Sequence, residues 1–307
     1  MAKSTQLTLL LISLSLLSAA ANAAPRFSPW GDAEREADTE NSVQGGCPIE
    51  SKDGLSLYMA SGRDGGLGMN DIWVADRFDT DEAFGEAYNL GEPVNSEYAD
   101  FCPTPLNGFY LMFVSTRPGP DACGGGDIHI VRRNPAKGWG DPVRLGCAED
   151  GEGPNTAYAE FSPSLVEIDG QVYLYYSSDG VDGSDQDIYV SELQPDGSFS
   201  VGVPVVELNT PDDDRMPNIS KNGLEIVFSS NRATWGGGQP AQGGQDVYTS
   251  SRSSTNAPWS EPENLGPGIN TVLSETRASM SWDRERLHFG RDGEIYLSTR
   301  FKQRGKP

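Results

Sequence analysis

Histidine and cysteine are scarce in this chain of 307 residues, which contains two histidines and four cysteines. No Cys-x-x-Cys pair occurs, so neither a thiol redox pair nor a zinc site has its ligands. The histidines, His129 and His288, each replace an aromatic residue in a predicted strand, and no G-x-S-x-G elbow accompanies them. A Ser-His-Asp mechanism is therefore disfavoured as well.

Positive charge is also scarce. The chain has 23 Lys and Arg residues against 45 Asp and Glu residues, which gives a formal net charge of -22. A surface this acidic repels the phosphates of nucleic acids and of anionic lipids. We therefore expect neither nucleic acid nor a membrane surface as a partner, whereas cations and other proteins are compatible with the charge.

Long apolar runs are missing beyond the N-terminus. There, Lys3 precedes the run LTLLLISLSLLSAA, and the small residues Ala21, Asn22 and Ala23 follow it. This pattern is typical of a secretory signal peptide over residues 1–23, cleaved near Ala23. We therefore expect a secreted or periplasmic protein without membrane insertion, whose four cysteines form two disulfides in an oxidising compartment.

A unit of two apolar β-runs flanking a glycine-containing loop recurs five times. An acidic residue opens the second run of each unit, and the five positions are Asp71, Asp127, Asp187, Asp246 and Glu294. Turn signals such as Lys-Asp-Gly predict a hairpin before each unit's first apolar run, and an aromatic residue opens a further strand after the second. Four antiparallel strands in about 55–60 residues are typical of one propeller blade.

The fifth unit stops after its third strand, and the segment from Trp30 to Ser42 matches the missing fourth one. We therefore predict that the N-terminal strand completes the last blade, which closes the ring without a long free edge. The expected fold is all-β: a single five-bladed β-propeller over residues 24–300, followed by a C-terminal tail at 301–307.

The segments SKDGLSLYMASGRDGGLGMNDIWV and SKNGLEIVFSSNRATWGGGQPAQGGQDVY resemble the TolB-like (WD-repeat-like) propeller repeat of exported bacterial proteins. The resemblance covers essentially the whole mature chain and is specific for fold. That family contains scaffolds, binding modules and domains appended to enzymes, so the resemblance implies little about function.

Strand direction places the glycine loops and the connections between blades on one face, which we call the loop face. Long loops around a propeller axis are a common binding site, so we expect a ligand there, a protein or a glycan. The candidate ligand-binding residues are Asp100, Glu160, Asp214, Asn95, Asn155 and Asn209. A monomer is expected.

The four cysteines fit this geometry. Cys47 and Cys102 occupy the same position in neighbouring blades, whereas Cys123 lies in a glycine loop and Cys147 in the connection that follows the same blade. Of the three possible connectivities we therefore predict Cys47–Cys102 and Cys123–Cys147, which would fasten loops.

Arginine recurs at the end of the second strand. Arg63, Arg117 and Arg232 are predicted to pair across the glycine loop with Asp71, Asp127 and Asp246, because bidentate pairs would fix the base of each loop. The third blade carries Asp179 in place of this arginine. Four carboxylates follow one another there, at Asp179, Asp182, Asp185 and Asp187. A solvated acidic turn is the favoured interpretation, and a Ca²⁺ site is the alternative.

Asp100, Glu160 and Asp214 each stand three residues before a proline, and Gly45 and Thr276 are taken as their counterparts in the first and fifth blades. Five-bladed glycosidases use three carboxylates that converge near the axis. We favour a non-enzymatic binding or scaffold module, and the alternative is a glycoside hydrolase that uses these three residues. Engagement of the carboxyls by arginine and backbone partners would deprive catalysis of its geometry.

Overall fold

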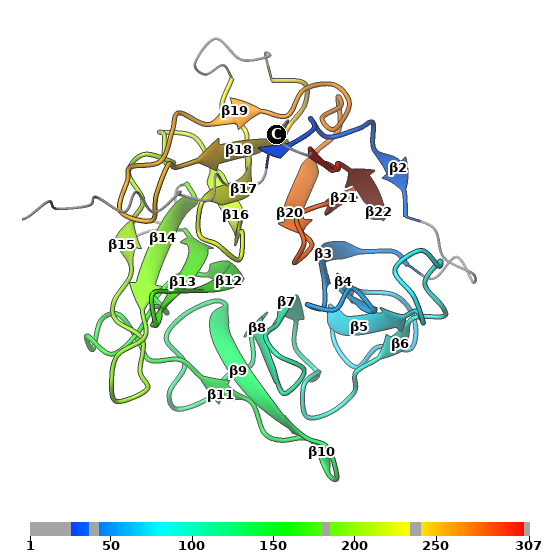
Figure 1. Ribbon diagram of the computed structural model, residues 1–307. Coiled ribbons are helices and arrows are strands. Elements are labelled where there is room, and N and C mark those ends of the chain that lie inside the picture. Colours follow the sequence, from blue (N-terminus) through cyan, green and yellow to red (C-terminus); the bar gives the residue numbers. More distant parts are fainter. Residues whose placement is uncertain (1–25, 37–42, 180–184, 234–240, 304–307) are drawn as a thin grey trace, which may run out of the picture.

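The computed structural model describes residues 26–36, 43–179, 185–233 and 241–303 of the chain. Within these residues every regular element is a β-strand. The strands form five antiparallel sheets in a ring around an axis, with β3, β7, β12, β16 and β20 nearest the centre (Figure 1). The predicted five-bladed propeller is therefore confirmed.

Each blade runs from an inner long strand to a short outer one, and in blade 2 two short strands share the outer position. From the inner to the outer edge the strands are β3 (Gly46–Glu50), β4 (Ser56–Ser61), β5 (Asp71–Asp76) and β6 (Tyr88–Asn89) in blade 1; β7 (Asp100–Pro105), β8 (Tyr110–Ser115), β9 (Asp127–Asn134), β10 (Gly138–Trp139) and β11 (Val143–Arg144) in blade 2; β12 (Glu160–Ile168), β13 (Gln171–Ser178), β14 (Asp187–Glu192) and β15 (Val203–Pro204) in blade 3; β16 (Asp214–Ile219), β17 (Glu225–Ser230), β18 (Asp246–Ser251) and β19 (Glu263–Asn264) in blade 4; and β20 (Glu275–Met280), β21 (Arg286–Arg291), β22 (Glu294–Thr299) and β2 (Glu34–Arg35) in blade 5.

The N-terminal segment closes the ring. In blade 5 β2 pairs with β22, so that Glu34 lies opposite Leu297 and Arg35 opposite Tyr296. The next residue, Glu36, is buried with its carboxylate 2.6 Å from the ring of His288. A separate two-stranded pair, β1 (Arg26–Phe27) with β23 (Lys302–Gln303), joins the N-terminal segment to the chain after blade 5. Closure by the N-terminal strand is thus confirmed.

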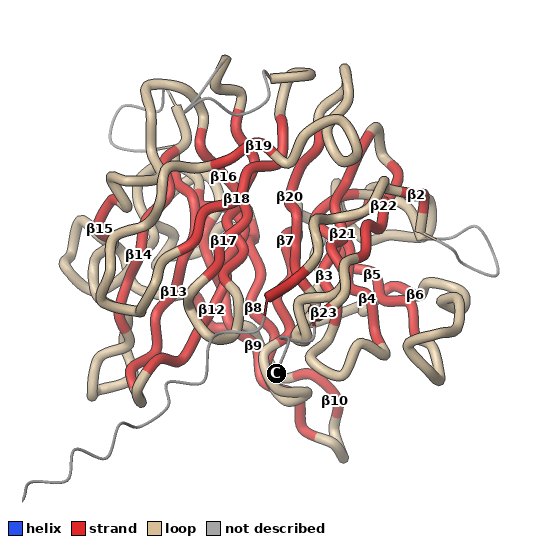
Figure 2. The backbone as a smooth tube through the Cα atoms, turned by 45° about the horizontal axis from the view of Figure 1, so that its top comes forward, coloured by secondary structure: helices blue, strands red, loops and turns tan. Residues whose placement is uncertain are grey.

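Loops gather at the two ends of the strands, as Figure 2 shows. Between these ends, the axis is filled by a side chain of blade 5. Arg277 on β20 is fully buried and donates hydrogen bonds to the carbonyl of Pro217 on β16 and to the hydroxyl of Thr104 on β7, both at 3.1 Å. These partners lie in different blades, so the guanidinium crosses the centre of the ring.

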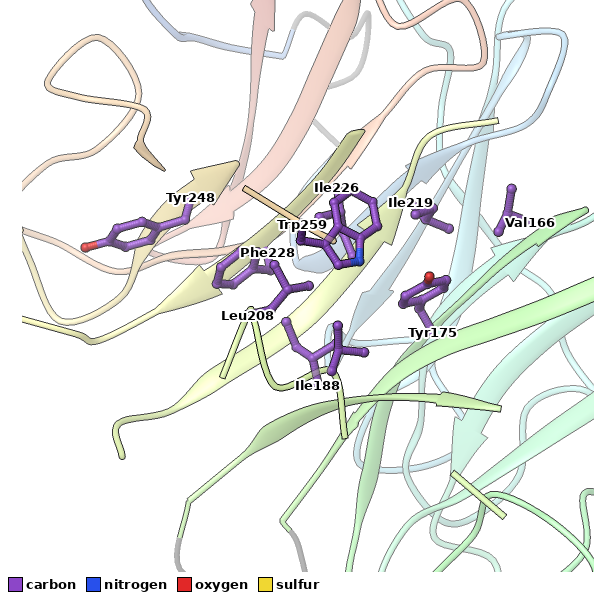
Figure 3. Close-up of a cluster of buried hydrophobic side chains, with 10 residues drawn as sticks. Val166, Tyr175, Ile188, Leu208, Ile219, Ile226, Phe228, Tyr248 and Trp259 are labelled. Carbon is purple, nitrogen blue, oxygen red and sulfur yellow. The ribbon is translucent and has the colours of Figure 1, made fainter. Parts of the chain in front are cut away.

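The hydrophobic core lies between adjacent blades. Figure 3 shows the cluster between blades 3 and 4, where Tyr175 and Ile188 pack with Phe228 and Tyr248. Trp259, which precedes the outer strand of blade 4, is buried in the same cluster, and the guanidinium of Arg252 lies 4.3 Å from its ring centroid. The aromatic residues that introduce the outer strands therefore serve blade packing.

Both predicted disulfides are present. Cys47–Cys102 joins the inner strands of blades 1 and 2, and Cys123–Cys147 joins the glycine loop of blade 2 to the connection that follows. Two disulfides are typical of a protein that folds in an oxidising compartment. Among the described residues no helix has the length and apolar character needed to cross a membrane. The proposed signal peptide, residues 1–23, lies outside the described residues.

Candidate functional site

Asp100, Glu160 and Asp214 begin the inner strands of blades 2, 3 and 4, and we call this shared position the carboxylate column. Blade 4 shows what the carboxylate at this position binds. Asp214 is fully buried and forms an ion pair with Arg232. Thr210, in the connection from blade 3, donates its backbone N–H and its hydroxyl to the same carboxylate, at 2.6 and 2.7 Å. Arg232 also donates to the carbonyl of Leu208 in that connection, at 2.6 Å. The carboxylate and the arginine together fasten the connection to the inner strand, an arrangement that we call the clamp.

Blade 2 repeats the clamp. Arg117 donates to Asp100 at 2.7 Å, and Ser96 donates its backbone N–H and its hydroxyl to that carboxylate, both at 2.7 Å. Asp100 is fully buried. The hydrogen-bonding capacity of Asp100 and Asp214 is thus taken up by arginine and by the blade connections, which deprives both of the geometry for acid or base catalysis.

Blade 5 carries the clamp as well, at a residue that the sequence comparison missed. Glu275 accepts hydrogen bonds from Arg291 and Thr271, each at 2.7 Å. Glu275 pairs in register with Arg291, the last residue of β21, as Asp214 pairs with Ser230, the last residue of β17. Glu275 is therefore the blade 5 counterpart of Asp214, and the prediction of Thr276 was wrong. The error arose because blade 5 has no proline to mark the position.

Blade 1 has no room for a carboxylate in this column. At Gly45 the backbone has a φ of +130°, and a Cβ atom would lie 2.2 Å from the carbonyl oxygen of Ala60. Only glycine fits such a conformation and such a close approach.

For Arg117 and Arg232 the predicted pairs with aspartates across the glycine loops are wrong. Arg117 and Arg232 turn to the inner strand of their blade, as described, because the start of that strand pairs with the end of the second one. Asp127 and Asp246 instead accept backbone N–H groups of their own loops, from Cys123 at 3.1 Å and from Gln242 at 2.7 Å. These aspartates shape the glycine loops.

The asparagines at equivalent positions in the connections between blades form hydrogen bonds with the backbone of the preceding blade. Asn95 accepts the N–H of Ile72 at 2.8 Å and donates its amide to the carbonyl of the same residue at 2.9 Å. The same two bonds join Asn155 to Ile128, Asn209 to Ile188 and Asn270 to Val247. Each amide thus continues the sheet of the preceding blade, which is a framework role for Asn95, Asn155 and Asn209.

Blade 3 departs from the clamp. Glu160 is fully buried and accepts hydrogen bonds from Thr156 at 2.7 Å and from Ser178 at 2.9 Å, both at Oε1. Its Oε2 has no hydrogen-bond partner, and no arginine pairs with it, within the described part of the chain. Burial raises the pKa of Glu160 to about 8, and the charge of Asp127 adds to this, while the bonds from Thr156 and Ser178 oppose it. Glu160 is therefore a protonated carboxylic acid at neutral pH.

The missing arginine can be located by register. Ser178 opposes Glu160 as Ser230 opposes Asp214, and Arg232 stands two residues beyond Ser230. The residue two beyond Ser178 is Gly180. Asp179, which was assigned to this position, is instead the counterpart of Asn231, since each donates its backbone N–H to the residue before the column carboxylate.

A cavity of about 260 Å³ lies beside Glu160, and we call it the blade 3 pocket. Its lining includes Thr156 and Ser178, the two donors to Glu160, together with Glu149 and the tyrosines Tyr158, Tyr176 and Tyr189. The hydroxyl of Tyr176 donates to the carbonyl of Pro154 at 3.2 Å, which is the bond that Arg232 makes to Leu208 in blade 4. The sequence analysis missed Tyr176, although it alone carries a hydroxyl in a column otherwise filled by Met59, Phe113, Phe228 and Phe289.

Glu149 supplies a second carboxyl to the blade 3 pocket. It is exposed to solvent and accepts the backbone N–H of Ala157 at 2.9 Å. Ala157 directly follows Thr156, which donates to Glu160. The pocket is therefore lined by one exposed carboxyl and reaches the buried carboxyl of Glu160 through the hydroxyls of Thr156 and Ser178, two environments of the kind that separate an acid from a base in enzymes.

A larger cavity, of about 670 Å³, lies in blade 2 and is lined by Arg117, His129 and Arg144, among others. Burial lowers the pKa of His129 to about 4, and its Nδ1 lies 2.9 Å from the carbonyl of Asp127. The imidazole is therefore neutral and held by the framework.

The alternative Ca²⁺ site involves Asp179, Asp182, Asp185 and Asp187, of which Asp182 lies outside the described residues. Across the ranges that the structure describes, no three or more Asp, Glu, His or Cys side chains come together as a metal site would need. Burial raises the pKa of Asp179, and the charge of Asp213 adds to it, whereas a hydrogen bond from Gln186 and the charge of Arg215 oppose it.

No model of a known protein family matches the sequence, and no curated protein does. The fold is similar to solved glycoside hydrolases. An alpha-L-arabinofuranosidase from Lactobacillus brevis is 12% identical with a TM-score of 0.54, covering 87% of this chain and 96% of that one. A GH43 endo-arabinanase from Bacillus licheniformis is 15% identical with a TM-score of 0.52, covering 88% and 97%. The catalytic domain of a GH62 alpha-L-arabinofuranosidase from Coprinopsis cinerea is 12% identical with a TM-score of 0.54, covering 90% and 98%.

These similarities correct two predictions. The TolB-like assignment is wrong, because the structures that match over nearly the whole chain are glycoside hydrolases. The preference for a non-enzymatic binding module is corrected by the same finding, because these structures of the same fold are enzymes. The sequence misled because hairpin turns and alternating β-runs report the construction of a blade, which propellers of different families share. At identities of 12 to 15%, what the chain shares with these enzymes is the fold.

Proposed function

We propose that this protein is a glycoside hydrolase in which Glu160 is the catalytic acid. The observation that carries the proposal is the state of Glu160, a buried carboxyl that pairs with no arginine of the described residues and whose two hydroxyl donors line a pocket, whereas Asp100 and Asp214 are held in clamps. Glycosidases need one carboxyl that stays protonated near neutral pH, and burial produces such a group. The similarity of fold to arabinofuranosidases and arabinanases supports the proposal.

The lining residues suggest how the proton reaches the substrate. Ser178 and Thr156 both contact Glu160 and line the pocket, so their hydroxyls connect the buried acid to it. As the glycosidic C–O bond breaks, the hydroxyl of Ser178, which donates to Glu160 in this structure, reverses that hydrogen bond: it takes the proton of Glu160 and gives its own proton to the leaving oxygen. Glu149 provides the second carboxylate that such hydrolysis requires, and the tyrosine rings provide apolar surface for a sugar.

A glycan hydrolase of this kind would act outside the cytoplasm. We assign residues 1–23 to a signal peptide removed near Ala23, residues 24–300 to the propeller and residues 301–307 to a tail. The two disulfides support this location, secreted or periplasmic.

The proposal is tested by hydrolysis assays on arabinan, other polysaccharides and aryl glycosides. Glu160→Gln should lower kcat on a natural glycan by about 10²–10⁴-fold, because general acid catalysis typically contributes that much. An aryl glycoside with a strongly acidic leaving group should be affected far less, since its leaving oxygen needs no proton. Activity should decline above about pH 8, the value to which burial raises the pKa of Glu160.

Glu152→Gln is a matched control, since Glu152 is an exposed carboxylate in the same connection that lines the blade 2 cavity instead. It should leave the rate unchanged. Equal loss of activity on natural and activated substrates in Glu160→Gln, or full activity of that variant on a natural glycan, would refute the assignment of the acid.

A further inference from the structure

Blade 4 shows what surrounds a guanidinium in this fold. The side chain of Arg232 is 1% exposed, and its guanidinium carbon lies 5.2 Å from the ring centroid of Phe228 and 5.1 Å from that of Tyr248. Its Nε donates to Ser230 at 2.9 Å, and Asp214 supplies the opposite charge. A guanidinium thus sits against two stacked rings, a serine and a buried carboxylate.

The blade 3 pocket repeats these surroundings without the arginine. Tyr176 and Tyr189 are cross-strand partners, as are Phe228 and Tyr248 in blade 4. The two pairs also stack alike, with centroids 5.9 Å apart at 24° in blade 3 and 6.0 Å apart at 23° in blade 4. Ser178 and Glu160 replace Ser230 and Asp214.

The pocket is also electrostatically suited to a cation. Among the described residues that line it there is no lysine or arginine, and the exposed carboxyl of Glu149 is one of them. The titratable groups whose charges act on the buried carboxyl of Glu160 are Asp127 on β9, which is paired with Arg144 at 2.7 Å, and Tyr176 on β13. Oε2 of Glu160 has no hydrogen-bond partner among the described residues, which leaves an acceptor for an N–H donor.

We propose that the blade 3 pocket binds the guanidinium group of a ligand, which lies against the stacked rings of Tyr176 and Tyr189 as Arg232 lies against those of Phe228 and Tyr248 in blade 4. Planarity and weak hydration let a guanidinium lie against aromatic rings while its N–H groups reach a carboxylate, and an ammonium matches this arrangement less well. As the cation binds, Glu160 releases its proton to solvent and becomes a carboxylate, because a neighbouring positive charge favours the ionised form.

This step has a consequence that rests on the proposed function. A bound guanidinium removes the proton that Glu160 would donate to a leaving group and fills the same pocket. Guanidinium compounds should therefore inhibit hydrolysis competitively with the glycan, while the binding itself requires no catalytic activity.

Binding is tested by calorimetry on the mature protein with methylguanidine, and with methylurea as a neutral molecule of similar shape. Methylguanidine should bind and methylurea should not. The affinity should rise close to tenfold per pH unit between pH 6 and 7, since only the ionised carboxyl pairs with the cation. At pH 7, titrations in buffers of different ionisation enthalpy should show about one proton released per ligand bound.

Two variants separate this site from unspecific attraction to an acidic surface. Glu160→Gln should weaken methylguanidine binding at least tenfold and abolish the proton release, whereas Glu152→Gln should change neither. Equal affinity for methylguanidine and methylurea, unchanged binding in Glu160→Gln, or binding without proton release would each overturn the proposal.

The source of the guanidinium is resolved by comparing methylguanidine, L-arginine amide and short peptides with an internal arginine. Tighter binding of the peptides than of the amide indicates an arginine side chain of a partner, and equal affinities indicate a small molecule; both support a guanidinium site. Hydrolysis of glycans without any guanidinium binding would refute this inference alone. Guanidinium binding in a protein without hydrolytic activity would refute the proposed function alone.

Discussion

Blades 3 and 4 have the same arrangement of four strands, the same register at the buried carboxyl and equivalent pairs of stacked rings. Their buried carboxyls nevertheless have opposite surroundings, since only one of them is paired with a positive charge. In blade 4 Asp214 is paired with Arg232 and anchored by Thr210. In blade 3 Glu160 keeps the equivalent threonine contact, through Thr156, and pairs with no arginine in the part of the chain that the structure describes. Loss of one cation therefore converts a structural ion pair into a protonated acid beside a cavity, since an unpaired buried carboxyl avoids its charge.

The largest effect should follow from making blade 4 like blade 3. Arg232→Met leaves Asp214 buried without its counter-charge, and breaking such a pair from one side typically costs about 3–5 kcal/mol of unfolding free energy. Urea denaturation at pH 7 measures this cost. The double variant with Asp214→Asn should recover part of it, because no buried charge then remains. A single variant as stable as the wild type would show that the ion pair contributes nothing to holding the blade.

A smaller effect should appear in the pH dependence of stability, through blade 3. The pKa of Glu160 rises from 4.5 to about 8 on folding. Below pH 4.5 the carboxyl of Glu160 is neutral in both the folded and the unfolded protein, so it does not lower the free energy of unfolding. As the pH rises towards 8 the unfolded state ionises first, so stability falls, by on the order of a few kcal/mol since each pKa unit corresponds to about 1.4 kcal/mol.

Glu160→Gln should remove this fall, because glutamine imitates the neutral acid and does not titrate. Denaturation midpoints at pH 5, 6, 7 and 8 for the two proteins measure the difference. Parallel curves across this range would mean that Glu160 is ionised in the folded protein and that blade 3 resembles blade 4 after all.

The fold could be predicted from the sequence because its determinants recur. Five copies of a turn, a glycine loop and an acidic residue set the number of blades, and the truncated fifth copy together with the segment from Trp30 to Ser42 indicates the closure. Cys47–Cys102 followed from equivalent positions in neighbouring blades, and Cys123–Cys147 from a glycine loop and the connection after the same blade. Each of these features depends on periodicity along the chain, which a single sequence displays.

The candidate site could be predicted only in part. The sequence identified Glu160 and the absence of an arginine in blade 3, but it assigned the other arginines to the wrong partners. A side chain at the end of the second strand can reach the loop ahead or the strand beside it, and the linear pattern does not distinguish the two. The pocket could not be predicted because it lies where other blades carry an arginine that blade 3 lacks. In the sequence, Tyr176 also looks like any other aromatic residue of a strand.

The smallest effect concerns a pair of equivalent serines. Ser178→Ala and Ser230→Ala each remove a hydroxyl that contacts the clamp position, and each should cost about 1 kcal/mol of stability, the usual contribution of one hydrogen bond. Their effects on chemistry should differ. Ser178 donates to Glu160 and opposes the rise in its pKa, so its removal should move the alkaline limb of the pH–activity profile to higher pH. Ser230 contacts Arg232 in another blade, and its variant should keep the wild-type profile. Identical profiles for all three proteins would separate Glu160 from the titration that governs activity.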